Sequence, residues 1–414
     1  MEVEKCNSLS LEDWPTLTQP VIKKREFKLI IPFHRLPLLV QVQAIQTMGP
    51  KDWINLAMTS KRNERVVKLT RLKTNWLVVQ ICQDACIQLP SLKLALFYDK
   101  TFWKIKKWEC MIKEDIKTWL NQPFSSMVEN AGILFQKIQN LFVFSNLKIS
   151  FCTDIERKAT IREFILNPVM KNWKNLTIYG KKISSEDLKM IMDTETSYRT
   201  FESKVEEMPL DFKHENAFKF FYQLYHDARW VKIEDLYGLR KLVHVDLYRN
   251  LFTQEQLKSF VNYWVNSKVD MFGWIQIISA ESLNFDSFVD GLLGLQSTNL
   301  NYKLFFTLSK SPSYMRRNNM LIIVYDFMRQ SLFLKAWNIN KEYTPSKNEE
   351  ENKKFENVGE ILTLLHRKKD LEDLLEVANE EAKQELREKI NERIAELSAF
   401  NVIFIDGKVT HQLF

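Results

Sequence analysis

Glycine is scarce in this sequence, and its cysteines are few and scattered. Only 9 glycines occur in 414 residues, which disfavours a Gly-rich phosphate-binding architecture. The 5 cysteines are odd in number and give neither a disulfide framework nor the paired spacing of a zinc site, so a reducing compartment is expected. They are Cys6, Cys82, Cys86, Cys110 and Cys152.

Long apolar runs and targeting signals are also missing. No apolar run approaches the roughly 18 residues that span a bilayer. The opening MEVEKCNSLSLEDWP lacks the basic and then apolar pattern of a secretory signal. Because 45% of the residues are hydrophobic and 12% aromatic, the chain can build a sizeable core. We expect a soluble protein of two or three units, located in the cytoplasm, the nucleus or both.

Catalytic motifs are absent as well. The sequence contains no G-x-x-x-x-G-K-[ST], G-x-G-x-x-G, H-E-x-x-H or G-x-S-x-G. His244 and Asp246 would share a strand face, and Cys82 and Cys86 could share a helical face, but neither pair has a third metal ligand nearby. Ordinary surface or packing roles are the favoured interpretation. The sequence therefore predicts a non-enzymatic protein without cofactor or metal.

Charge is distributed unevenly. The net charge is +7, yet residues 349–397 carry 15 acidic and 9 basic residues, so the remainder carries +13. A basic run within residues 60–73, with Trp76, Trp103 and Trp108 nearby, raises the hypothesis of nucleic-acid binding. A solvated helical face and core tryptophans explain the same residues, so this hypothesis ranks third. The basic residues are Lys61, Arg62, Arg65, Lys68, Arg71 and Lys73.

The segment from Leu36 to Arg62 is unusually apolar. Its spacing predicts a short helix with Pro37 in the first turn, and Gly49-Pro50 then ends it and starts a second helix. Two such helices cannot bury all their apolar surface against each other, so part of it must face the rest of the chain or another protein. The apolar positions include Leu38, Val40, Val42, Ala44, Ile45, Met48, Trp53, Ile54, Ala57 and Met58.

An internal repeat follows. Residues 175–192 align with residues 244–261 at an offset of 69, and each copy alternates like a strand before entering a helix at a hydroxyl residue. Strand anchors at 149, 178, 247 and 277 predict a unit near 30 residues with an irregular double-length interval. The spacing L-x-L-x-x-N-x-L around Asn250 is typical of leucine-rich repeats, which stack into an α/β solenoid.

The C-terminal region departs from this repeat. Residues 318–339 predict a strand pair around Met328-Arg329-Gln330, a single long charged helix is expected over about 358–398, and Asp406-Gly407 marks a tight hairpin. The seam of that helix is formed by Leu371, Leu375, Ala378, Ala382, Leu386, Ile390 and Ile394.

These observations predict an α+β/α/β fold with five segments. A small all-helical module is followed by an irregular leucine-rich-repeat-like solenoid with hairpin strands and a long helix at its C-terminal side. The segments are a flexible leader at 1–26, the helical module at 27–75, the solenoid at 76–340, a solvated linker at 341–357, and a helix and hairpin packed on the solenoid at 358–414.

The apolar segment resembles an F-box. Leu36-Pro37, the stretch MGPKDW at 48–53, and Ser60-Lys61-Arg62 follow the F-box pattern of a Leu-Pro start, a Leu-x-Pro-x-Asp-Leu break and a Ser-Lys-Arg end. Leu39 departs from it, because an acidic residue is usual there; Thr59 and Asn63 replace a valine and a tryptophan. The flanking FKLIIPFHRLP and TSKRNERVVKL are similar to the variant expanded in nematodes.

A second stretch, residues 228–277, resembles the type-2 F-box-associated domain of the same family. The matching positions are Trp230-Val231, Asp235-Leu236, Leu251-Phe252-Thr253, Glu255, Leu257, Phe260 and Trp264.

The resemblance implies a substrate-recognition subunit of an SCF-type (cullin-RING) ubiquitin ligase. Such a protein binds a Skp-family adaptor on a cullin scaffold, captures a protein target and performs no chemistry itself. A second hypothesis is an interaction protein that uses the same adaptor but masks its target without ubiquitination. The adaptor contacts that the resemblance assigns are Leu36, Pro37, Val40, Ile45, Met48, Trp53 and Leu56.

Strand alternation also suggests where a target would bind. If Ile178, Val245 and Leu247 point inward, their neighbours line an exposed face, where aromatic and arginine residues are favoured contacts. Both tyrosines could equally cover neighbouring strands. The candidate target-binding residues are Thr177, Tyr179, Asp246, Tyr248 and Arg249.

Overall fold

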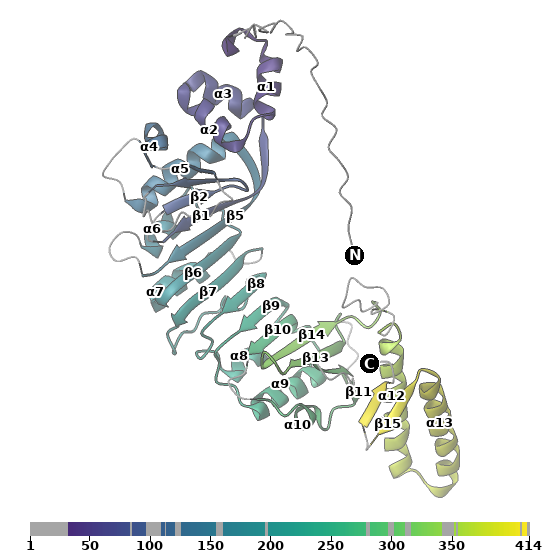
Figure 1. Cartoon of the computed structure of the whole chain (residues 1–414). Coiled ribbons are helices and arrows are strands. Elements are labelled where there is room, and N and C mark those ends of the chain that lie inside the picture. Colours follow the sequence, from purple (N-terminus) through teal and green to yellow (C-terminus); the bar gives the residue numbers. More distant parts are fainter. Residues whose placement is uncertain are drawn as a thin grey trace, which may run out of the picture.

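The computed structural model has a mixed α/β fold shaped as a crescent (Figure 1). A single large sheet runs along the crescent, with small helices at its N-terminal end and a helical hairpin at its other end. The residues that the structure describes are 32–82, 85–96, 109–111, 113–120, 126–154, 160–194, 198–278, 282–296, 302–310, 316–341, 352, 355–405 and 408–411. The predicted leader at 1–26, and residues 342–351 and 353–354 of the predicted linker, lie outside them.

Three helices form the N-terminal module. They are α1 (Leu38–Gln46), α2 (Pro50–Thr59) and α3 (Lys61–Leu69). Pro37 is the residue before α1, Pro50 opens α2, and the Ser60 hydroxyl accepts a hydrogen bond from the Asn63 amide at 3.2 Å to start α3. Strand β1 (Leu72–Ile81) follows at once, so the predicted boundary at 75/76 lies inside this strand.

Sixteen strands of the described residues pair into one sheet, of order β15-β16-β11-β12-β13-β14-β10-β9-β8-β7-β6-β5-β1-β2-β3-β4. Its centre is a parallel run of seven strands, extended by mostly antiparallel pairs on both sides. The parallel strands are β1, β5 (Phe142–Cys152), β6 (Asn175–Lys182), β7 (Thr200–Glu207), β8 (Tyr222–Tyr225), β9 (Leu242–Leu247) and β10 (Phe272–Ile278). Beyond β1 lie β2 (Ala85–Gln88), β3 (Leu92–Ala95) and β4 (Glu109–Met111).

The repeat differs from the sequence prediction in its middle part. In register, Ile178 pairs with Ser203, Ser203 with Tyr225, and Tyr225 with Leu247. The supposed double-length interval therefore holds three units of 25, 22 and 22 residues. The sequence hid β7 and β8 because two of their inward positions, Ser203 and Gln223, are polar although wholly buried.

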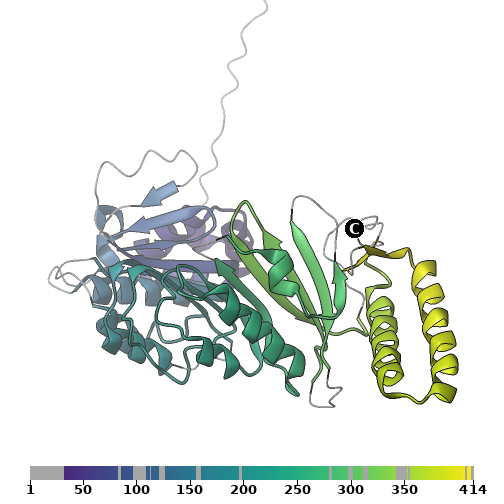
Figure 2. The same ribbon diagram turned by 90° about the horizontal axis from the view of Figure 1, so that it is seen from below.

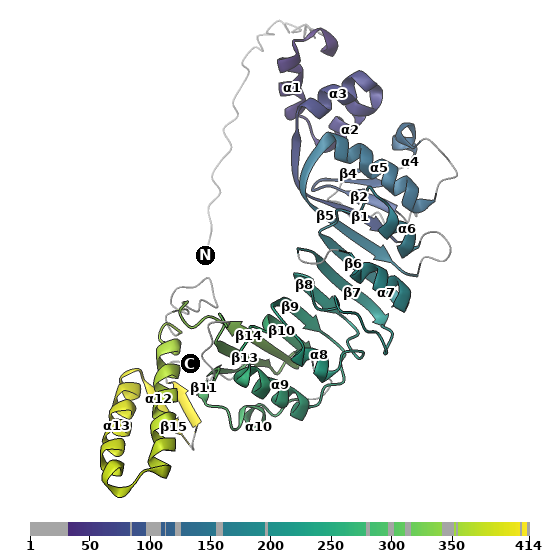
Figure 3. The same ribbon diagram turned by 180° about the vertical axis from the view of Figure 1, so that it is seen from behind.

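Helices cover one face of the parallel run, on the convex side of the crescent (Figures 1 and 3). Ser126, Thr160, Ser184 and Thr253 each accept a hydrogen bond from the amide three residues later and so start their helices. The predicted caps at Ser184 and Thr253 are confirmed. The helices are α5 (Met127–Leu141), α6 (Ile161–Leu166), α7 (Ser185–Met192), α8 (Ile233–Tyr237), α9 (Gln254–Asn266) and α10 (Phe285–Val289).

The predicted hairpins are present at the C-terminal side. Strands β13 (Met320–Asp326) and β14 (Ser331–Trp337) pair antiparallel, as do β15 (Val402–Ile405) and β16 (Lys408–His411). Asp406 and Gly407 lie outside the described residues. Two further strands, β11 (Gly294–Gln296) and β12 (Lys303–Leu308), complete this part of the sheet.

The single long helix predicted over 358–398 is wrong. The chain forms two helices, α12 (Val358–Val377) and α13 (Glu380–Ala399), which fold into a hairpin (Figure 2). Ala378 is extended, and the Asn379 side chain accepts the Ala382 amide at 3.1 Å, so Asn379 caps a new helix. The seam predicted for one helix is half-buried or buried along both. None of the described helices combines the length and apolar character needed to cross a bilayer.

Helix α12 packs on the face of the sheet opposite to α5–α10. Along β13, Leu321 and Ile323 join the main core under the convex helices, whereas Met320 and Ile322 join a second core with Leu362 of α12. Strands β12 and β13 are thus buried on both faces, which explains their continuous apolar runs. Helix α12 therefore packs on the antiparallel end of the sheet.

A buried arginine ties the segment before β13 to the end of α9. The Arg316 guanidinium donates to the carbonyls of Trp264 at 2.9 Å, Ser267 at 2.6 Å and Asn318 at 2.9 Å, and lies 3.7 Å from the Trp264 ring centroid. Burial lowers the pKa of Arg316 to about 10. Its hydrogen bonds satisfy carbonyl groups at the C-terminus of α9.

We predict that Arg316→Ala destabilises the fold by about 3 kcal/mol, because it removes three hydrogen bonds to backbone carbonyls and the contact with the Trp264 ring. Chemical denaturation followed by tryptophan fluorescence measures this loss. Arg317→Ala is the matched control, since the Arg317 side chain is exposed, and it should leave the free energy of unfolding nearly unchanged. Equal effects of the two substitutions would contradict this role of Arg316.

Candidate functional site

An apolar ledge stands at the N-terminal end of the crescent. We define it as Pro37, Leu38, Leu39 and Val40, at the start of α1. Leu38, Leu39 and Val40 are 54%, 69% and 41% exposed, and Pro37 is exposed as well. Three consecutive large apolar side chains in solvent are unusual on a surface that binds nothing.

The residues assigned to adaptor contact divide between this ledge and the core. Pro37 and Val40 are exposed on the ledge, whereas Ile45 is wholly buried in the core that also includes Ile54 and Val67, so it contributes to no surface. Trp53 is half-buried: its indole N–H donates to the Ile45 carbonyl at 2.6 Å, and its ring lies 5.7 Å from that of Phe142. The remaining three are also half-buried: Leu36, Met48 and Leu56.

The basic run lies mainly on α3. The Lys61, Arg65 and Lys68 side chains are exposed and line a shallow hollow of about 230 Å³. Glu64, on the same helix, forms an ion pair with Lys137 at 3.7 Å. Trp76 is half-buried on β1, while Trp103 and Trp108 lie outside the described residues. The basic residues of α3 therefore form a solvent-exposed helical face, which is the alternative that their spacing in the sequence allowed.

The other candidate surface is the open face, which we define as the side of β5–β10 and β14 turned away from the convex helices. The predicted inward residues Ile178, Val245 and Leu247 are wholly buried, which confirms the alternation. Thr177 and Asp246 consequently lie in one row across the sheet, through Glu202 and Leu224.

The predicted target-binding residues differ in accessibility. Tyr179 is 38% exposed, with the Lys204 ammonium 5.6 Å from its ring centroid, and Tyr248 is half-buried with its ring stacked 6.0 Å from His226. Arg249 is exposed at the edge and donates to the Glu206 carbonyl at 2.9 Å. Thr177 is half-buried, and Asp246 is almost wholly buried.

The Asp246 carboxylate interacts with neighbouring side chains of the protein itself. Its carboxylate accepts the Tyr222 hydroxyl at 2.7 Å and lies 2.8 Å from His244 Nε2. Burial, then the hydrogen bond and charge of Asp246, raise the pKa of Tyr222 far above its ordinary value. The histidine–aspartate pair seen in the sequence is thus a hydrogen-bonded pair that fixes two rings on the open face.

The two cysteines that the sequence spacing could have placed on one helical face do not lie on a helix. Cys86 is on β2, Cys82 follows β1, and the Gln80 amide between them is 3.5 Å from the Cys82 sulfur and 3.7 Å from the Cys86 sulfur. Burial raises the pKa of the Cys82 thiol. Within the described residues, no group of three or more His, Cys, Asp or Glu is arranged to hold a metal ion.

Aromatic side chains continue from Tyr222 and His244 toward α12, and we call this group the aromatic platform. Successive ring centroids lie 4.7 Å apart from Tyr222 to His244, 5.6 Å from His244 to Trp274 and 5.8 Å from Trp274 to Phe333. Trp337 is its fifth member, two residues beyond Lys335 on β14.

Lys335 lies between the two tryptophans of the platform. Its ammonium is 5.6 Å from the Trp274 ring centroid and 4.6 Å from that of Trp337. Partial burial lowers the pKa of Lys335. Sequence reasoning missed this region because β8 was unrecognised and β14 was assigned only to a hairpin. The period-two spacing of Phe333, Lys335 and Trp337 was the available signal.

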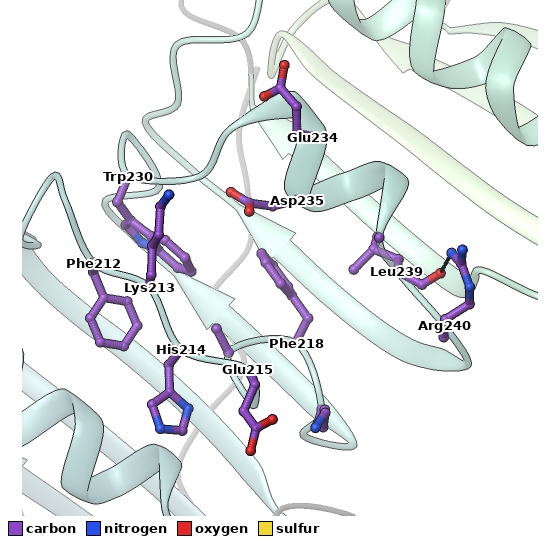
Figure 4. A pocket seen from close by; sticks show the side chains of 13 residues that line it. Phe212, Lys213, His214, Glu215, Phe218, Trp230, Glu234, Asp235, Leu239 and Arg240 are labelled. Carbon is purple, nitrogen blue, oxygen red and sulfur yellow. Dashed lines mark hydrogen bonds between the residues drawn. The ribbon is translucent and has the colours of Figure 1, made fainter.

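A separate pocket of about 620 Å³ opens on the convex side, between residues 212–219 and α8 (Figure 4). Trp230 packs against Phe212 and Phe218, with ring centroids 5.3 and 5.8 Å away, and its indole N–H has no hydrogen-bond partner among the described residues. Charges of both signs line the rim. They come from Lys213, Glu215, Lys219, Glu234, Asp235 and Arg240.

We predict that Asp246→Asn lowers the pKa of Tyr222, because it removes the negative charge beside the phenol. Ultraviolet titration should then show Tyr222 ionising at lower pH than in the wild-type chain, although burial still holds its pKa above the ordinary value. The raised pKa means that the folded chain binds this phenol proton more tightly than the unfolded chain. Its stabilisation is therefore complete below about pH 10 and is lost at higher pH. Asp211→Asn, at an exposed carboxylate, is the control. An unchanged titration of the Asp246 variant would show that this contact does not hold Tyr222.

Comparison with known proteins adds no assignment. No protein-family model, no curated protein and no solved structure matches the chain.

Proposed function

We propose that this chain is a non-catalytic, F-box-type substrate receptor of an SCF-type ubiquitin ligase. The ledge and adjoining half-buried residues bind a Skp-family adaptor carried on a cullin, and the leucine-rich-repeat-like open face binds a protein target. The observation that carries the proposal is the exposed ledge within the stretch that matches the F-box pattern.

Burial of the ledge by the adaptor would be energetically favourable. Full burial of a leucine or valine side chain contributes about 1.5–3 kcal/mol. Leu38 and Val40 have about half of their surface in water, so a partner that covers them gains part of this free energy. Leu39 stands where an F-box usually carries an acidic residue, so we do not count it in this gain. Ile45 supports the same surface from beneath, since it anchors α1 in the core.

The arrangement also suits a receptor that does no chemistry. Strand β1 begins three residues after α3 ends, so the helical module continues directly into the sheet that carries the open face. A target held on that face stays at a restricted distance from whatever binds the ledge. Its lysines then gain effective concentration near a charged ubiquitin carrier without a catalytic residue from this chain.

Replacing Leu36 and Pro37 together by alanine, or Val40 by aspartate, should reduce adaptor binding at least 10-fold, because these changes remove or charge the apolar contact surface. Binding of purified adaptor to the full chain is measured by titration calorimetry. Retained affinity in both variants would contradict the proposed role of the ledge.

Two further substitutions sharpen this test. Leu166→Asp alters a leucine that is 64% exposed far from the ledge, and it should leave adaptor binding unchanged. Leu39→Glu should be tolerated, because the F-box pattern usually has an acidic residue at this position. Loss of binding through Leu39→Glu would indicate a different apolar interface from that of an F-box.

We expect the abundance of a captured target to rise when the proteasome is inhibited in cells that express the chain, and to stay high with the Leu36/Pro37 variant. If the chain suppresses the activity of the target but proteasome inhibition leaves the abundance of the target unchanged, the result would instead support masking without ubiquitination. Target abundance by quantitative immunoblotting decides between the two outcomes.

A further inference from the structure

We propose that the aromatic platform binds an extended segment of the target that carries an acidic side chain, which Lys335 contacts directly. The inference rests on the proposed function only in naming the segment as part of a ligase target. Binding of such a peptide requires neither the adaptor nor the ledge.

The platform is held in place before any ligand arrives. Tyr222 on β8 and His244 on β9 are both bonded to the buried Asp246 carboxylate, so the orientations of the two rings are fixed. Trp274 packs against His244 on one side and Phe333 on the other. A rigid aromatic surface loses little conformational entropy on binding.

The dimensions suit an extended peptide. The rings from Tyr222 to Phe333 follow one another across β8, β9, β10 and β14 at centroid spacings of 4.7, 5.6 and 5.8 Å. At about 3.3 Å per residue, this length corresponds to about five residues of extended chain. The rings are half-buried, so part of each one remains accessible to the side chains of such a segment.

Lys335 sets the charge of the preferred ligand. Its ammonium lies against two indole faces and is partly removed from water, which disfavours its charged form. A carboxylate bound beside it would stabilise that charged form, whereas a basic side chain would be repelled. The Asp246 carboxylate already bonds Tyr222 and His244, and Glu202 is paired with Lys204 at 2.8 Å.

The same features favour a peptide over a nucleic acid. Stacking on Trp274 could accommodate a base, but single-stranded nucleic acids also require a groove of several cations along the backbone. On the open face near the platform, Lys204 is already paired with Glu202 at 2.8 Å. The backbone phosphates of a nucleic acid would therefore gain little from Lys204.

Three pools of fluorescent seven-residue peptides test the proposal. They differ only in the fixed central residue, glutamate, glutamine or lysine, with degenerate flanking positions. Fluorescence anisotropy with the purified full chain should give at least 10-fold tighter binding of the glutamate pool than of the glutamine pool, and weakest binding of the lysine pool. Equal binding of the glutamate and glutamine pools by the wild-type chain would overturn the proposal.

Substitutions at Lys335 test whether this residue causes the preference for the glutamate pool. Lys335→Met keeps an unbranched apolar stem on the indole rings but removes the charge, so the preference for glutamate should vanish; Lys335→Glu should shift it toward the lysine pool. Lys148→Met, at an exposed lysine of the same open face, should retain the preference for glutamate. A glutamate preference that survives Lys335→Met would overturn the assignment.

Two more measurements close the test. If the Lys335 variants fold poorly, the rate of acylation of Lys335 in the wild-type chain is measured instead. The glutamate pool should slow this acylation, and the glutamine pool should not. Equal acylation rates with the two pools would contradict the proposal. A single-stranded oligouridylate that binds more tightly than the glutamate pool and competes with it would overturn it in favour of nucleic acid. Failure of adaptor binding with an intact glutamate preference would reject the ligase function alone.

Discussion

The alternation of side chains along the parallel strands is the constraint on which both faces of this protein depend. One row of inward positions runs from Val79 through Ile149 and Leu176 to Val245 and Ile275, and all five side chains are buried. A shift of one residue in any strand would move its apolar set into solvent and its open-face residues into the core. The hydrophobic core therefore fixes the register, and the register decides which side chains can meet a partner.

Much of this architecture could be predicted from residue patterns, and the failures have physical causes. Alternation identified the inward Ile178, Val245 and Leu247, and hydroxyl caps marked the starts of helices. Strands β7 and β8 escaped because the inward positions Ser203 and Gln223 are polar; inside the core they donate hydrogen bonds to the Met208 sulfur and the Phe220 carbonyl. The break at 378–379 escaped because the apolar seam continues through it, although Asn379 is a favourable helix cap.

The candidate site was predictable in part for the same reason. Tyr179 and Tyr248 follow from alternation within their own strands, which is local information. The platform requires the pairing of β10 with β14, strands more than 50 residues apart in the chain. Helix α12 adds a second non-local effect: it covers the open side of β12 and β13, where Met320 pairs with Trp337 and Ile322 with Lys335. The accessible surface therefore ends at β14.

Asp246 shows how a buried charge can shape specificity without meeting the ligand. A carboxylate removed from water is costly unless its oxygens are satisfied, and here residues of β8 and β9 satisfy them. The same bonds hold Tyr222 and His244 as rigid parts of the platform. In the proposed complex, Lys335 supplies the charge that an acidic side chain would meet at the far end of the platform. Repulsion of basic segments would then exclude wrong partners, while contact with the rings would retain suitable ones. Rigid rings with a charge of one sign at their end provide selectivity without a deep pocket.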